Sequence, residues 1–277
     1  MKKIAVILMC IGVSIGSLTG CGTANNKGAA SGSAVEEVKY CDDDFVKDFG
    51  KGLEKRWKLT DADENKDGYD DIQLNSDQWK KMMLTYINAE LDTIEKYTNE
   101  KFENTNLQEN AIKYINLLKQ HKESCDYITV DYDKYSEKAD EIYNERSKII
   151  KDMVENYGVT VDEKYQDTLN EFLTNSQLVE EDESLKEAVG LMLGKIEITT
   201  TDDGTGYYTC EGYVENTTGH DFDNISIKFN LYDDEGVLVD NQPCYLENFT
   251  NGTKARLEFY TNQDFSTFET SAEWWDN

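Results

Sequence analysis

Hydrophobic residues in the first two thirds of the chain recur every three or four positions, which is the spacing of an amphipathic helix. This spacing predicts four long helices, which begin near Asp42, after Ser76, near Asn106 and near Asp131. Their predicted apolar stripes are Phe45, Phe49, Leu53 and Trp57; Trp79, Met83, Ile87, Leu91 and Ile94; Ala111, Ile115 and Leu118; and Tyr135, Ala139, Ile142, Ile149 and Met153.

Two shorter helices are expected near 163–174 and 183–193, and Gly158 is a suitable residue to end the fourth long helix. No proline lies between residues 35 and 193. Long amphipathic helices joined by short breaks favour a helical bundle, so this stretch is interpreted as a first, helical domain with the stripes as its core.

The pattern changes near Gly194, where alternation of apolar and polar residues replaces the helical period. Thr, Ile, Tyr and Phe become frequent, as is typical of strands. Strands are expected over 195–201, 207–215, 225–232, 237–240, 254–261 and 268–275. Short strands separated by regular turns predict an antiparallel β-sandwich over 194–277, and hence an α+β chain with two domains.

One motif in this second domain resembles a known family. Phe229-Asn230-Leu231-Tyr232-Asp233 is similar to the motif of the FxLYD domain, which is found in many bacterial surface lipoproteins. The stretches 212–219 and 233–239 resemble its Asn-rich turn and its hairpin, and 246–253 takes the place of a turn that in the family contains proline. The resemblance implies an immunoglobulin-like sandwich and no agreed enzymatic activity.

The motif residues also have a physical interpretation of their own. Phe229 and Leu231 share one strand face and are expected in the core, whereas Tyr232 points the other way, with its hydroxyl able to reach backbone at the rim. Asp233 can cap the tight turn that ends at Gly236. All five are therefore expected to be fold residues. More weakly, Arg56-Trp57 and 143–146 (YNER) make the helical region similar to a domain that often accompanies FxLYD.

The N-terminus is interpreted as a secretion and membrane-anchoring signal. Lys2 and Lys3 precede the apolar run 4–15, which has signal-peptide length and is too short to span a bilayer. Leu18-Thr19-Gly20-Cys21 then resembles the lipobox of bacterial lipoproteins, which implies a signal peptide over 1–20, diacylglyceryl attachment at Cys21 and an extracytoplasmic, membrane-anchored protein. The alternative is an ordinary signal peptide with a chance cysteine. Residues 21–34 are expected to form the lipidated start of a flexible tether.

The formal charge of −28 narrows the classes of partner. So acidic a surface repels phosphate backbones and anionic headgroups, so nucleic acid is not expected as a partner and the folded part should stand off the membrane. Cations, basic proteins and basic polymers are favoured, although acidity also has the simpler role of keeping the protein soluble.

An acidic stretch between the first two helices matches half of a calcium loop. Asp63, Asn65, Asp67, Tyr69 (through its carbonyl) and Asp71 take the alternate ligand positions of an EF-hand-like loop, and Gly68 takes its turn position. The loop then lacks its strongest ligand, because a leucine stands where a bidentate glutamate is required. Calcium as a structural clip and a plain polar loop both stay open.

Four further cysteines are divided evenly between the two predicted domains. The simplest pairing in an oxidising compartment is Cys41 with Cys125 and Cys210 with Cys244, and buried free thiols are the alternative. A zinc site is not expected, since no CxxC motif is present.

No pattern in the chain indicates catalysis. The two histidines, His121 and His220, do not accompany a nucleophile pattern, and neither a phosphate loop nor a GxSxG motif occurs. We therefore expect a non-enzymatic cell-surface lipoprotein that binds an envelope protein or polymer and has no cofactor other than possible calcium. The alternative is a surface protein that captures a small solute or calcium.

Overall fold

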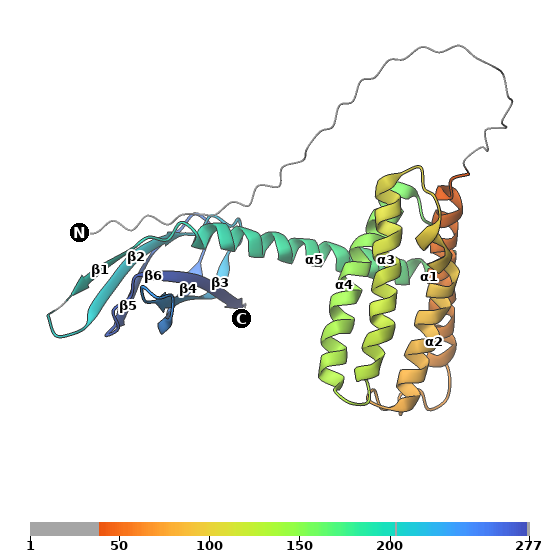
Figure 1. Ribbon diagram of the computed structural model, residues 1–277, viewed down its shortest axis with the longest axis horizontal. Helices are drawn as coiled ribbons and strands as arrows, with labels where there is room; N and C mark the ends of the chain where they lie inside the picture. The colour runs from red at the N-terminus through yellow and green to blue at the C-terminus, as the bar shows by residue number, and fades with distance from the viewer. Residues whose placement is uncertain (1–38, 203, 276–277) are drawn as a thin grey trace, which may run out of the picture. The chain divides into compact units, whose positions relative to one another are not determined.

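A computed structural model describes residues 39–202 and 204–275 (Figure 1). The expected signal peptide, Cys21 and the tether lie outside these residues. The helices are α1 (Asp42–Glu64), α2 (Asp77–Ile94), α3 (Thr105–Ser124), α4 (Tyr132–Tyr157) and α5 (Gln166–Leu193), with short 3-10 turns at Glu95–Asn99, Cys125–Tyr127 and Glu163–Tyr165. The strands are β1 (Ile198–Asp202), β2 (Tyr208–Glu215), β3 (Phe222–Tyr232), β4 (Leu238–Phe249), β5 (Lys254–Thr261) and β6 (Thr267–Trp275). The chain is thus α+β.

The four predicted long helices are confirmed, and local signals explain where they begin and end. The Ser76 hydroxyl accepts a hydrogen bond from the backbone N–H of Trp79 at 3.1 Å, so it caps α2. Asp131 caps α4 in the same way through the N–H of Lys134. Gly158 ends α4 in the left-handed conformation with φ +71°, as its position in the sequence predicted.

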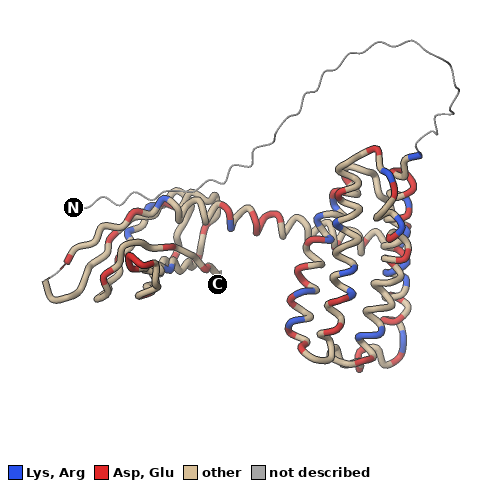
Figure 2. The backbone as a smooth tube through the Cα atoms, in the orientation of Figure 1, with Lys and Arg blue, Asp and Glu red and all other residues tan. Residues whose placement is uncertain are grey.

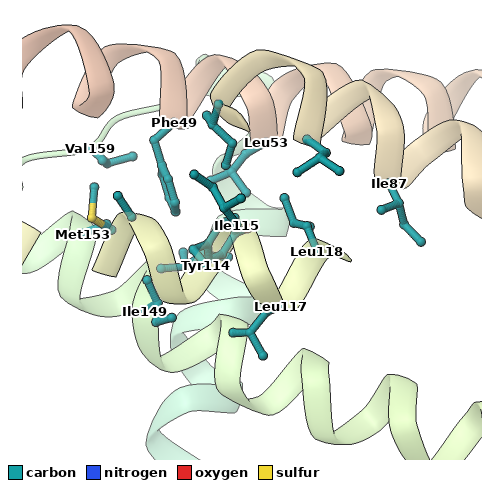
Figure 3. Packing of buried hydrophobic residues seen from close by; sticks show 14 of the residues in the cluster. Phe49, Leu53, Ile87, Tyr114, Ile115, Leu117, Leu118, Ile149, Met153 and Val159 are labelled. Carbon is teal, nitrogen blue, oxygen red and sulfur yellow. The ribbon is translucent and has the colours of Figure 1, made fainter. Parts of the chain in front are cut away.

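The predicted stripes pack into one core shared by the helices. Figure 3 shows Phe49 and Leu53 of α1 facing Tyr114, Ile115 and Leu118 of α3, and all five side chains are buried. Trp79, Met83 and Ala139 are only partly buried at the margin of this core. Aromatic rings fill much of the remaining volume, as in the edge-to-face contact of Phe45 with Phe102, whose ring centroids lie 5.5 Å apart.

The prediction of two short helices near 163–174 and 183–193 is wrong. A single helix, α5, runs without a break for 28 residues. The acidic stretch in its middle has no apolar period, but ion pairs support it: Lys186 bonds Asp182 one turn away, and Lys148 and Lys151 of α4 bond Glu183 and Glu180. A missing apolar stripe therefore did not mean a missing helix.

The strands form two three-stranded antiparallel sheets, in the orders β1-β2-β5 and β4-β3-β6. Alternate residues of β3 (Ile225, Ile227, Phe229 and Leu231) are buried, and both sheets contribute to one apolar cluster. The ring of Phe229 lies 4.8 Å from that of Phe259 in the other sheet. Each sheet therefore has one face in this core and one face toward solvent.

Strand β4 is longer than the sequence predicted. It continues through the stretch 241–249, where a turn was expected from residue 246, and the turn begins only at Thr250. Pro243 lies within it because β4 is an edge strand, where a missing N–H costs no ladder hydrogen bond.

The change from the first apolar cluster to the second does not coincide with the predicted domain boundary. Val189, Met192 and Leu193, the last turns of α5, pack with the strands rather than with the other helices. Leu169 and Phe172, near the start of α5, pack with the helices. The change from one core to the other thus falls inside α5 and not at residue 194, because the helix has a different apolar face at each end.

Candidate binding face on the sheet β4-β3-β6

The solvent face of the sheet β4-β3-β6 carries a hollow of about 290 Å³. Three strands contribute to it in register: Tyr245 and Glu273 lie opposite Ser226 on either side, and Pro243 and Ser271 lie opposite Lys228. Asn241 and Ala272 complete the lining. We call the seven residues Ser226, Lys228, Asn241, Pro243, Tyr245, Ser271 and Glu273 the β3 face.

The polar side chains of the β3 face make no hydrogen bond or ion pair with any other part of the chain that the structure describes. Lys228 and Glu273 lie one row apart on neighbouring strands and still do not form an ion pair. Tyr245 is 69% exposed. Donors, acceptors and an aromatic ring therefore converge on one hollow with their bonding capacity directed to solvent.

The solvent face of the other sheet provides a contrast. There Arg256 forms ion pairs with Glu211 and Glu258, and the Tyr260 hydroxyl donates to Glu258. The Lys254 ammonium lies 5.0 Å from the ring centre of Tyr213. Charged and aromatic groups on that face satisfy one another across the strands. The groups of the β3 face thus differ from those of the other sheet, and also from Tyr232 and Glu269 farther along β3 and β6, which bond each other.

The motif that suggested the second domain lies at the end of β3 and has the expected structural roles. Phe229 and Leu231 are fully buried. The Asp233 carboxylate accepts from the N–H groups of Glu235 and Val237, and Gly236 has φ +78° in this turn. Tyr232 does face the other way, but its hydroxyl donates to the Glu269 carboxylate at 2.9 Å rather than to backbone.

The structure gives the calcium interpretation of the 63–71 loop no support. Both carboxylate oxygens of Asp63 are already engaged, one by the Lys66 ammonium and the other by the Tyr86 hydroxyl. The Asn65 amide donates to a backbone carbonyl of α1. Across residues 39–202 and 204–275 no three acidic, Cys or His side chains come together as metal ligands. Asp67, Tyr69 and Asp71 lie in a series of tight turns, and calcium binding there stays a prediction.

The predicted bridge between Cys41 and Cys125 is wrong. The N–H of Cys41 bonds the carbonyl of Lys101, next to the start of α3, whereas Cys125 caps the far end of α3. A helix of 20 residues separates them by about 30 Å, and a disulfide requires Cα atoms within about 7 Å. Burial, with nearby acidic charge for Cys41, raises the pKa of both thiols to about 11.

Cys210 and Cys244 are free thiols as well, although they belong to one core. The Cys244 sulfur lies 3.6 Å from the carbonyl oxygen of Glu258, and Cys210 pairs across the strands with Phe259. Both cysteines thus lie next to β5 from opposite sheets. Their pairing under oxidising conditions stays a prediction.

A buried charged cluster, which the sequence did not predict, lies among the helices. The Glu90 carboxylate accepts hydrogen bonds from the Arg146 and Arg56 guanidinium groups, at 2.8 and 3.1 Å, and from the Tyr114 hydroxyl. Helices α1, α2, α3 and α4 each supply one of these four residues. Burial would raise the pKa of Glu90, but the charges of Arg146 and Arg56 outweigh it and hold the pKa low.

His121 lies close to this cluster, and among the described residues neither of its ring nitrogens has a hydrogen-bond partner. Burial, together with the positive charges of Arg56 and Arg146, lowers the pKa of this histidine well below 6.5. The ring is therefore neutral at physiological pH and packs near Tyr135. All groups of the cluster itself are paired and enclosed, so it serves the fold and leaves the β3 face as the candidate site.

The sequence analysis identified neither the buried charged cluster nor the β3 face, although the sequence contains an indication of each. Arg146 continues the spacing of Ile142, Ile149 and Met153, so a charged residue on an apolar stripe marked the buried cluster. Tyr245 alternates with Cys244 and Leu246 in a strand that was expected to end at residue 240. A strand extended to residue 249 would have placed Tyr245 on an exposed face.

Comparisons with known proteins add no relative. No family model matches the chain, and neither the curated proteins nor the solved structures contain a significant match. Within the part of the chain that the structure describes, no helix has the length and apolar character needed to cross a membrane.

Proposed function

We propose that this protein is a lipid-anchored, extracytoplasmic binding protein without enzymatic activity, and that it contacts its partner through the β3 face. In this proposal the two-sheet region is an immunoglobulin-like sandwich of the FxLYD kind, and the helical region is a bundle joined to it through α5. The membrane anchor is the diacylglyceryl group expected on Cys21.

One observation carries the binding role: the β3 face gathers unpaired polar groups around an exposed tyrosine. Interfaces are enriched in tyrosine, because its ring offers a large contact area and its hydroxyl a hydrogen bond at little cost in side-chain entropy. A face that existed only for solubility would gain from internal ion pairs such as those of Arg256 on the other sheet.

Photo-crosslinking in cells tests this proposal at the face itself. The full-length tagged chain carries the substitution Tyr245→p-benzoylphenylalanine, whose excited ketone inserts into C–H bonds of proteins and of glycans. The matched control is Tyr213→p-benzoylphenylalanine, on the other sheet, where the native tyrosine is 58% exposed. A Cys21→Ser version of each chain reports whether capture requires the anchor.

We expect a discrete adduct from position 245, little from position 213, and a loss of both membrane association and capture on Cys21→Ser. Equal labelling from positions 245 and 213 would show that the β3 face has no special role in binding. A Cys21→Ser chain that stays with the membrane would contradict the anchor.

A further inference from the structure

The chemistry of the β3 face narrows the class of its ligand. We infer that it binds a neutral, hydroxyl-rich polymer, namely a segment of an uncharged glycan. This inference rests on the proposed function, since it names the ligand of the same face.

The hydrogen-bonding groups of the β3 face suit hydroxyls in particular. Lys228 only donates, Glu273 only accepts, and Ser226, Asn241 and Ser271 do both. A ligand hydroxyl also donates and accepts, so it can bond any of the five side chains. A polypeptide strand would instead use its backbone at a sheet edge, and the β3 face centres on β3, the middle strand of its sheet.

Charge argues against an anionic ligand. The β3 face holds one ammonium and one carboxylate, so its own net charge is zero, whereas the whole chain carries −28. The wider field repels phosphate, sulfate and uronate groups, and a single lysine without an arginine offers them no bidentate partner. Acidic and basic positions are interspersed along the described backbone (Figure 2).

The apolar part of the β3 face lies along one strand. Pro243 and Tyr245 are two residues apart on β4, so their rings share one face at a separation of about 7 Å. Such rings can stack against the C–H faces of sugar rings, while the polar side chains of β3 and β6 meet the hydroxyls beside them.

The size of the hollow fits part of a chain and not an enclosed small molecule. Its volume of about 290 Å³ corresponds to roughly ten water molecules. Pockets that surround small ligands start at about 300 Å³ and extend to about 1,000 Å³. A hollow of this size, at the lower limit, is suited to contact a short stretch of a longer polymer.

Affinity electrophoresis of the full-length chain in mild detergent tests this inference. Native gels contain one soluble polysaccharide each: dextran, glucomannan or galactomannan as uncharged probes, and polygalacturonate as the anionic probe. The variants are Tyr245→Ala and Glu273→Gln on the β3 face, with Tyr213→Ala as the control on the other sheet. Circular dichroism confirms that each variant is folded.

At least one neutral polysaccharide is expected to retard the wild-type chain, and polygalacturonate is not. Loss of the Tyr245 ring should weaken retardation about threefold to tenfold, as expected for one aromatic contact, and Glu273→Gln should weaken it as well. Tyr213→Ala should behave as the wild type. If Tyr245→Ala fails to fold, Glu273→Gln alone decides.

Two results would overturn the glycan inference: no retardation by any neutral probe, or retardation that Tyr245→Ala and Glu273→Gln leave unchanged. The photo-crosslinking result then separates the two proposals. A protein adduct at position 245 without polysaccharide retardation would keep the binding role and replace the ligand class. Equal labelling at positions 245 and 213 would remove the binding role itself.

Discussion

The buried cluster shows how a few charged residues can define the packing of four helices. Two guanidinium groups, Arg56 and Arg146, share the single carboxylate of Glu90 in an interior that excludes water. Ion pairs of this kind contribute little net stability when intact, because desolvation offsets their attraction. Their influence appears when one partner is removed, since the remaining charges are then buried without compensation.

The substitution Glu90→Gln should therefore lower the free energy of unfolding by about 3–5 kcal/mol, because two buried arginines lose their counter-ion. The matched control is Glu95→Gln, which removes an exposed ion pair with Lys119 and should cost less than about 1 kcal/mol. Urea unfolding followed by circular dichroism measures both. Similar losses for the two variants would mean that the buried pairing has no special importance.

His121 should make the helical region sensitive to acid. Its folded pKa lies below the ordinary value of 6.5, so on acidification the unfolded chain binds a proton that the folded chain does not. This contribution to stability is complete above pH 6.5 and is lost as pH falls, with a slope of up to about 1.4 kcal/mol per pH unit. The histidine faces Arg56 and Arg146, which oppose its protonation.

Between pH 7 and pH 5 the free energy of unfolding should accordingly fall less steeply with pH in His121→Leu than in the wild type. The difference in slope should correspond to about one proton. An unchanged slope in His121→Leu would place the acid sensitivity elsewhere.

At the scale of elements, two helical glycines differ in what surrounds them. A Cβ atom on Gly50 of α1 would lie 2.6 Å from the backbone carbonyl oxygen of Thr160, whereas one on Gly190 of α5 would meet nothing within 4 Å. Gly50 thus allows the segment after α4 to cross α1 closely. Gly190 has no such role and only adds flexibility to the unfolded chain.

Gly50→Ala should therefore destabilise the protein by about 1–3 kcal/mol through overpacking. The same change at Gly190 should stabilise it by about 0.5–1 kcal/mol, because alanine is the better helix former. Thermal unfolding of the two variants side by side checks this. A stabilised Gly50→Ala chain would contradict the close crossing.

The sequence predicted elements well where a single apolar period persists. Helices α1 to α4 each have one stripe that faces one core, so Phe45, Phe49 and Leu53 were sufficient to place α1. The prediction failed for α5, because its two ends face different cores and no stripe continues between them. It also failed for β4, which was expected to end at residue 240 but continues to Phe249 along the edge of its sheet.

The candidate site was the least predictable feature. Ser226, Lys228 and Ser271 are ordinary exposed strand residues in the sequence, and only the registers of β3, β4 and β6 bring them together. Pairing between strands depends on contacts between residues far apart in the chain. A single sequence without its pairings therefore gives the alternation of faces but not which exposed residues become neighbours.

At the scale of the whole molecule, the described residues contain two apolar clusters that have only α5 in common. Residues 177–184, in the middle of this helix, are exposed or nearly so. Few apolar contacts therefore link the melting of one cluster to that of the other.

Calorimetry should resolve two unfolding transitions. Ile149→Ala changes the helical core and Ile227→Ala the sheet core. Each should lower the free energy of unfolding of its own core by about 2–5 kcal/mol and shift only that core's transition to lower temperature. A single transition that both variants shift equally would show that the two cores unfold as one.

The shared helix also has a mechanical consequence. Any tension applied between the helices α1–α4 and the two sheets must pass along the single backbone of α5, since no other element of the described chain belongs to both clusters. A helix under axial load yields one hydrogen bond at a time, and each residue that leaves the helix lengthens the backbone from about 1.5 Å to about 3.4 Å. The exposed middle of α5 would unwind and extend first, so it would take up the load before either core unfolds.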